Sequence, residues 1–237
     1  MPDFRPVSFR HEAADLEGQV VVPEAPGRRA AVLVMSSGMG LGEQYREVAR
    51  RLAKQGYVAL ATDMYGNGAH YSVPKEAGAS LGPLWGNPAL LRSRVVAWFE
   101  MLKSLPEVDP DRVAAIGYCF GGQCVLELAR SGADVKAVVS YHGILKTSMP
   151  AQIGVVKGLV AIYTGNKDPY APREDVDAFL AEMRAAKARW HLTVFGDAYH
   201  AFTAKEDRSL PVEGIAYDPL ADAVSWAGTL ALLESLV

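Results

Sequence analysis

The feature that most constrains the fold is residues 112–124, where an apolar run ends in a glycine-rich turn directly before a helical pattern. The turn at 117–122 reads Gly-Tyr-Cys-Phe-Gly-Gly. A strand that turns this sharply into a helix leaves its central residue strained and exposed, and only small flanking residues permit the approach. The pattern is typical of a nucleophile elbow, with Cys119 in the place of serine. Because a helix N-terminus favours a thiolate, the elbow predicts covalent acyl chemistry.

Length and composition predict one large domain rather than several. The 237 residues are 50% hydrophobic, which is ample for a single core spanning 1–237. The net charge of -3 and the pI near 6.0 provide no basic stripe, so we expect no nucleic-acid partner and a small-molecule substrate instead.

The sequence also favours a particular cellular compartment and oxidation state of the cysteines. No run approaches the roughly 18 apolar residues of a membrane helix, and the first residues lack an apolar leader segment. We therefore expect a soluble, cytoplasmic protein with no membrane partner. The two cysteines, Cys119 and Cys124, are five positions apart at one helix start, where a disulfide is geometrically awkward, so both are predicted as free thiols. The pattern makes no prediction of oligomeric state.

Strand-like and helix-like segments alternate along the chain. Apolar runs predict strands at 19–22, 30–35, 57–62, 112–116, 135–140, 159–164 and 191–195. Helical spacing and end signals predict helices at 44–55, 91–102, 120–131, 176–183 and from 219 onward. This alternation predicts an α/β fold with a mostly parallel central sheet and helices on both faces.

One segment, residues 65–87, is rich in Gly, Ala, Ser and Pro and shows no clear periodicity. Long irregular segments inside compact domains are often lids or binding loops, so we expect an irregular lid or binding loop here. Tyr71, Leu84 and Trp85 are candidates for the wall of an apolar pocket. A surface loop anchored by a few apolar residues is the alternative.

Two later loops supply partners for the thiol. Asp168 follows the strand at 159–164, and His200 follows the strand at 191–195. In the α/β-hydrolase arrangement the nucleophile precedes an acid and then a histidine, each on a loop after a later strand. His200 would then take the proton of Cys119 and later activate water, while Asp168 would orient the imidazole.

Alternatives remain for the acid. Asp168 could instead form a turn before Pro169, in which case Asp197 or Asp63 would be the acid. The backbone N–H groups of Phe120 and Gly38 are the expected oxyanion donors, because one follows the nucleophile and the other lies after an early strand. The residues expected to line the pocket are Ser37, Met39, Tyr65, Trp85, His142 and Phe202.

A competing motif lies early in the chain. Gly38, Gly40 and Gly42 follow a predicted strand and precede a helix, which is similar to a dinucleotide-binding turn. The fingerprint requires a third glycine at position 43, where Glu43 would repel a pyrophosphate. A nicotinamide-dependent oxidoreductase is therefore only a third hypothesis, and we expect no cofactor. The histidines show no metal-site spacing, so we also expect no metal.

The residues resemble the dienelactone hydrolase family over nearly the whole chain from about residue 15. Matching pieces are the elbow at 117–122, Gly-Tyr-Val-Ala-Leu-Ala-Thr-Asp-Met-Tyr-Gly at 56–66, Ser-Tyr-His-Gly at 140–143 and Tyr-His-Ala-Phe-Thr at 199–203, with Ala-Tyr-Asp at 216–218 and Ser-Trp at 225–226. The resemblance implies an α/β-hydrolase fold and cofactor-free hydrolysis of ester or lactone bonds. It also implies a Cys, His, Asp triad at Cys119, His200 and Asp168.

Two departures from the family pattern bear on function. Well-studied members carry a glutamate that helps to deprotonate the thiol where this chain has Ser37, so activation falls to His200 and the helix dipole, or to another acid such as Glu43. Those members hold a substrate carboxylate with arginines, one of them at the position of Ala204, and the candidates to replace them are Lys205, Arg92 and Arg94.

The leading hypothesis is a hydrolase that cleaves a small ester, lactone or thioester through a cysteine acyl-enzyme. The ordered acid and histidine after the elbow favour it. The alternative, favoured by Ser37, is a catalytically weak family member that acts as a binding or regulatory protein.

Overall fold

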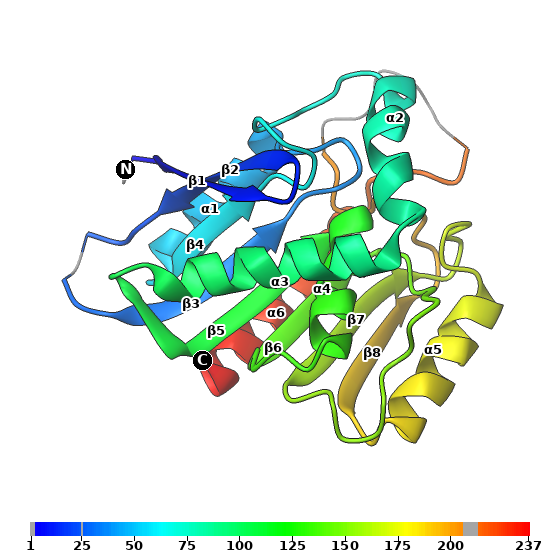
Figure 1. Cartoon of the computed structure of the whole chain (residues 1–237). Helices are drawn as coiled ribbons and strands as arrows, with labels where there is room; N and C mark the ends of the chain where they lie inside the picture. The colour runs from blue at the N-terminus through cyan, green and yellow to red at the C-terminus, as the bar shows by residue number, and fades with distance from the viewer. Residues whose placement is uncertain (1–2, 25, 206–212) are drawn as a thin grey trace.

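The computed structural model describes residues 3–24, 26–205 and 213–237, which form one twisted sheet flanked by helices (Figure 1). The strands are β1 (Arg5–His11), β2 (Ala14–Val21), β3 (Arg29–Met35), β4 (Val58–Thr62), β5 (Val108–Tyr118), β6 (Ala137–Tyr141), β7 (Leu159–Gly165) and β8 (Arg189–Phe195). The helices are α1 (Glu43–Lys54), α2 (Pro74–Trp85), α3 (Pro88–Ser104), α4 (Phe120–Arg130), α5 (Arg173–Ala185) and α6 (Pro219–Leu236).

The eight strands lie in the order β1-β2-β4-β3-β5-β6-β7-β8. The β1–β2 and β2–β4 pairs are antiparallel, and every pair from β4 through β3 to β8 is parallel. In a parallel sheet the carboxyl ends of the strands share one edge, and ligands bind outside that edge. The loops after β3, β5 and β7 therefore lie together, and the loop after β8 joins them.

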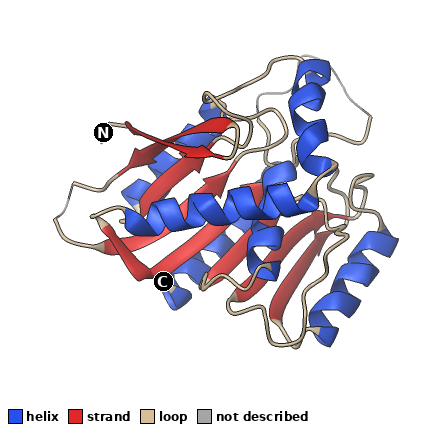
Figure 2. Cartoon of the chain, viewed as in Figure 1, coloured by secondary structure: helices blue, strands red, loops and turns tan. Residues whose placement is uncertain are grey.

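Helices cover both faces of the sheet, as Figure 2 shows. Strand β3 explains why: Leu33 and Met35 point into one core, whereas Val32 and Val34 point into the other. A strand that is buried on both faces is apolar at every position. The first core is shared with α2, α3, α4 and α5, and the second with α1 and α6. The predicted α/β architecture is confirmed.

Two parts of the chain differ from the prediction. The segment 65–87 is not wholly irregular, since α2 occupies its second half. Gly78, Gly82 and Pro83 are poor helix formers and hide the pattern, yet the buried Ala77, Leu81 and Leu84 stand at helical spacing. The antiparallel β1 was also missed, because its polar, exposed residues carry no continuous apolar run.

No helix in the described ranges is long and apolar enough to span a membrane.

Candidate active site

The elbow lies where β5 passes into α4. Cys119 has φ 55° and ψ −114°, a conformation that residues with a side chain rarely adopt. Its backbone N–H donates to the carbonyl of Tyr141 at 3.0 Å, which fixes the turn against β6. A Cβ at Gly121 would stand 2.2 Å from the carbonyl oxygen of Met35, so only glycine lets α4 approach β3. The strained cysteine is held rigidly at the sheet edge.

The thiol of Cys119 is partly buried and surrounded by donors. Burial alone would raise its pKa, but a hydrogen bond and charge from His200 act in the opposite direction. The backbone N–H groups of Gly38 and Phe120 also lower the pKa of the thiol. The net result is a pKa below the usual value of the thiol. Both expected oxyanion donors therefore act on the same atom.

His200 and Asp168 form a buried pair. The Nδ1 atom of His200 lies 2.8 Å from Oδ2 of Asp168, and both side chains are almost inaccessible. The other carboxylate oxygen of Asp168 accepts the backbone N–H of Tyr170 at 2.8 Å. The carboxylate thus orients the ring while remaining part of the turn after β7.

The charge on His200 is stabilised from both sides. Burial would lower the pKa of the imidazole, but hydrogen bonds with Asp168 and Cys119 outweigh it and raise the pKa to about 10. A raised pKa on the histidine and a lowered one on the cysteine favour a thiolate–imidazolium pair. The three predicted residues are brought together.

The rival acids lie elsewhere. Asp197 is almost fully exposed and pairs with Lys167 at 2.8 Å on the surface. Asp63 is buried, but its carboxylate accepts the backbone N–H groups of Tyr65, Gly66 and Gly68. Of the three carboxylates considered, Asp168 is the one that contacts His200.

The loop after β3 has no acid that contacts the thiol. The hydroxyl of Ser37 accepts the backbone N–H of Met39 at 3.3 Å and carries no charge that could stabilise the imidazolium or accept the thiol proton. The carboxylate of Glu43 is bound by Arg50 and Arg46 on the surface of α1. The residues that lower the pKa of Cys119 are therefore His200 and two backbone donors rather than a carboxylate.

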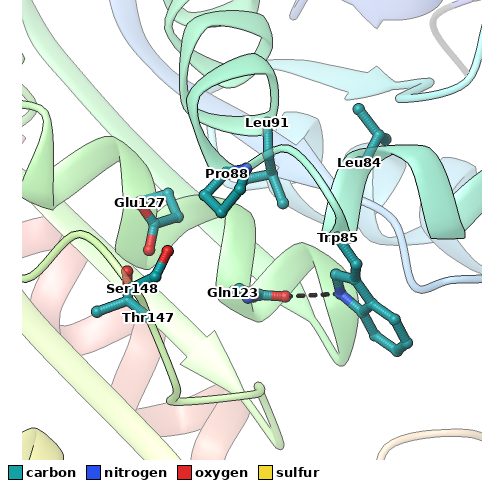
Figure 3. A pocket seen from close by; sticks show the side chains of 8 residues that line it. All are labelled: Leu84, Trp85, Pro88, Leu91, Gln123, Glu127, Thr147 and Ser148. Carbon is teal, nitrogen blue, oxygen red and sulfur yellow. Dashed lines mark hydrogen bonds between the residues drawn. The ribbon is translucent and has the colours of Figure 1, made fainter.

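A groove of about 500 Å³ opens beside the elbow. It is lined by Trp85, Pro88, Gln123, Ile144, Lys146, Thr147, Ser148, Pro169, Tyr170, Pro172 and Asp175. Figure 3 shows an adjoining, smaller pocket that shares Trp85 and Gln123 with the groove, and there the Trp85 indole donates to the Gln123 side chain at 3.0 Å. Sequence reasoning named Trp85 but missed Tyr170, whose ring lies 4.6 Å from that of His200. The position of Tyr170, two residues after Asp168, was the available signal.

Two residues expected in the pocket are core residues instead. Phe202 is fully buried and packs against Phe195 and His142 in the second core, so the expectation that it lines the pocket is wrong. His142 is also buried, with Nε2 at 2.8 Å from the hydroxyl of Thr203. Its ring stands edge-on to that of His200, with ring centroids 5.2 Å apart, so it packs against the His200 imidazole. Ser37, Met39 and Tyr65 are partly exposed in the loops after β3 and β4.

The cations proposed to hold a substrate carboxylate are engaged elsewhere. Arg92 binds Glu127 at 2.6 Å, and Arg94 is buried and donates to the carbonyl of Met64. Lys205 pairs with Asp222 at 3.4 Å. Within the described ranges, no three His, Cys, Asp or Glu side chains are grouped to bind a metal ion.

Comparison with known proteins agrees with the geometry. The model of the dienelactone hydrolase family matches residues 16–237. A solved dienelactone hydrolase-like promiscuous phosphotriesterase from metagenomic libraries is 35% identical, with a TM-score of 0.92, and the match covers 99% of this chain and 98% of that one.

Curated relatives point the same way. An uncharacterized protein of Caenorhabditis elegans is 35% identical over 147 residues, which are 61% of this chain and 92% of the relative. A Synechocystis protein, provisionally named a carboxymethylenebutenolidase, is 27% identical over 89% of this chain and 90% of its own length. The chain belongs to the dienelactone hydrolase family and is, like that family, an ester and lactone hydrolase of α/β-hydrolase fold.

Proposed function

We propose that this enzyme hydrolyses a small carboxylic ester, lactone or thioester through an acyl-enzyme on Cys119. His200 acts as acid and base, and Asp168 orients its ring. The observation that carries this proposal is the convergence on one sulfur: the imidazole of His200, which is paired with Asp168, and the N–H groups of Gly38 and Phe120 all lower the pKa of the Cys119 thiol.

In the first half-reaction the thiolate of Cys119 attacks the carbonyl carbon, and the carbonyl π electrons move to oxygen. The N–H groups of Gly38 and Phe120 then donate to the new oxyanion. When the intermediate collapses, the imidazolium of His200 donates its proton to the departing alkoxide or thiolate. The products are a thioester on Cys119, a neutral imidazole and a free alcohol or thiol.

The second half-reaction releases the acid. The neutral imidazole of His200 accepts a proton from water as the water oxygen attacks the thioester carbon. The same two N–H groups stabilise the second oxyanion. Collapse expels the thiolate of Cys119 beside the imidazolium, which restores the resting pair. The carboxylate of Asp168 holds Nδ1 throughout, so that Nε2 is the atom that exchanges protons.

The lowered pKa of Cys119 argues against a purely binding role. Ser37 supplies no carboxylate, but the net effect of His200, Gly38 and Phe120 still favours the thiolate. A protein selected only to bind a ligand has no need for a strained, activated thiol aligned with a buried acid–histidine pair.

A panel of short-chain esters, lactones and thioesters tests the proposal, with wild type, Cys119→Ala, His200→Ala and the matched control Cys124→Ala. We expect turnover by wild type and Cys124→Ala, and a loss of at least about a thousandfold in the other two. Quenching during the steady state should yield a mass adduct of the acyl group on Cys119. Full turnover by Cys119→Ala, or no turnover by wild type on any substrate, would contradict the proposal.

A second candidate reaction is phosphotriester cleavage, which the solved phosphotriesterase relative favours. The same thiolate would attack phosphorus, displace an alkoxide or aryloxide, and place the phosphoryl oxygen on the same two N–H groups. Diethyl phenyl phosphate is the probe. A phosphorylated Cys119 detected by peptide mass supports this reaction, and unmodified protein with no phenol release counts against it.

A further inference from the structure

The groove lies next to the proposed catalytic residues, and two of its lining residues contact them. Gln123 stands one helical turn after the thiol, and its backbone N–H donates to the carbonyl of Cys119. On the opposite wall Tyr170 lies against the ring of His200. The groove is therefore positioned to take a group attached to the reacting carbonyl, and its volume of about 500 Å³ is typical of a small-molecule site.

The walls of the groove are aromatic and stiff. Trp85 is 47% exposed and Tyr170 45% exposed, which is unusual for such large apolar rings. Both line the groove together with Pro88, Pro169 and Pro172, whose rings restrict the backbone. Exposed aromatic surface gathered around a concavity marks a binding site.

Trp85 is held in place before any ligand arrives. Its indole N–H donates to the side-chain oxygen of Gln123 at 3.0 Å (Figure 3), and the Gln123 amide donates to the carbonyl of Lys146 at 3.4 Å. The indole ring also packs edge-on against Phe120, with ring centroids 6.4 Å apart. This chain links α2, α4 and the loop after β6, so the aromatic wall is preorganised.

The charges of the groove are already paired. Lys146, the lysine among its lining residues, lies 3.3 Å from Asp175, whose side chain is 7% exposed while that of Lys146 is 72% exposed. In the adjoining smaller pocket of Figure 3, the carboxylate of Glu127 is likewise bound by Arg92 and Arg130. A substrate carboxylate would have to share Lys146 with the carboxylate of Asp175, which would repel it. The described groove therefore offers a carboxylate no unpaired cation.

We propose that the groove is the subsite for an uncharged aromatic group of the substrate, and that the Lys146–Asp175 pair excludes carboxylated substrates. This inference rests on the proposed ester hydrolysis and names its substrate class: neutral aryl or arylalkyl esters. Trp85 and Tyr170 supply flat surfaces for the aromatic ring, and the paired charges of Lys146 and Asp175 favour a substrate that carries no charge.

Kinetics with three neutral esters test the aromatic subsite. Phenyl acetate and methyl phenylacetate carry the ring on opposite sides of the carbonyl, and ethyl acetate carries none. Ratios of variant to wild type cancel the intrinsic reactivity of each ester. We expect Trp85→Ala to raise KM about fivefold more for at least one aromatic ester than for ethyl acetate. Tyr199→Ala, which removes an exposed aromatic side chain outside the groove, is the matched control.

The charge claim has its own test. Asp175→Asn keeps the shape and frees Lys146, so kcat/KM for the 4-carboxy derivative of the responding aromatic ester should rise about fivefold relative to its neutral parent. Lys146→Ala in the same background should remove this gain. Equal responses of all esters to Trp85→Ala, or an unchanged ratio in Asp175→Asn, would overturn the inference. Failure of the proposed hydrolysis is distinguished because it appears as undiminished turnover by Cys119→Ala.

Discussion

The hydroxyl of Tyr65 donates to the carbonyl of Gly38 at 2.8 Å, and this bond ties the loop after β4 to the loop after β3. The same tyrosine ring stacks on Phe120, with centroids 6.2 Å apart and planes 8° apart. Tyr65 thus contacts both residues whose N–H groups lower the pKa of Cys119. Burial raises the pKa of its hydroxyl, so that the hydroxyl remains a donor.

We expect Tyr65→Phe to lower kcat about tenfold while KM changes little. The ring and its stacking remain, but Gly38 loses its anchor, and an oxyanion donor that is misaligned loses part of the 10²–10³ that such a donor contributes. The pKa of Cys119, measured from the pH dependence of its alkylation rate, should rise in parallel. Tyr71→Phe is the control, because that hydroxyl bonds to Ser80 rather than to the site. An unchanged kcat and thiol pKa in Tyr65→Phe would contradict this role.

The two thiols should react at different rates over a wide pH range. The pKa of Cys119 is lowered mainly because His200 offsets its burial, whereas burial raises the pKa of Cys124 well above its usual value. Iodoacetamide at neutral pH should therefore modify Cys119 and leave Cys124 intact in the folded protein. Peptide mass analysis measures both sites, and equal labelling would show that the thiolate is not stabilised.

The pH profile of kcat/KM should be broad. Activity rises as pH passes upward through the lowered pKa of Cys119, because the thiolate is the attacking form. It falls as pH passes through about 10, because His200 then loses the proton that the leaving group needs. In Asp168→Asn the imidazolium loses its carboxylate partner, so the alkaline limb should move to lower pH. If the alkaline limb stays at the same pH in this variant, a group other than His200 is responsible for it.

Asp168→Asn should also reduce kcat by about 10⁴, since the ring of His200 loses both its orientation and its counter-charge. Asp197→Asn is the matched control: it removes a carboxylate from an exposed pair with Lys167 and should leave turnover within about twofold. Steady-state kinetics on one ester compares the two. The reverse order of effects would move the acid to Asp197.

The sequence could predict that the candidate residues lie close together, because their order along the chain and their positions at the ends of strands are visible in it. Asp168 and His200 each follow a recognisable strand, and parallel strands bring their carboxyl ends together whatever the loop details. The two expected oxyanion donors could be predicted for the same reason. Gly38 follows β3, which lies directly beside β5 and the elbow.

The errors share a physical cause: the hydrophobic periodicity of a segment does not show which residues from other segments it contacts in the fold. Phe202 reads as a pocket residue because it follows His200 closely, but the turn directs it into the core. Tyr170 looks like an ordinary turn residue, and only the fold places its ring against His200. The groove also needs Ile144 and Pro172, which come from loops after different strands. Such a surface is assembled by tertiary structure and leaves no linear pattern.

The elbow itself predicts a difference between two glycine substitutions. Gly121→Ala places a methyl group 2.2 Å from the carbonyl oxygen of Met35 and 2.5 Å from that of Ser36, and backbone atoms cannot move aside cheaply. We expect it to destabilise the protein by about 2 kcal/mol or more and to abolish turnover by displacing Cys119. Gly82→Ala, inside α2, meets no atom within 4 Å and should stabilise the protein by about 0.5–1 kcal/mol through helix propensity. Chemical denaturation measures both changes. Equal stability of the two variants would show that α4 can move away from β3, and would remove the basis for regarding the elbow as rigid.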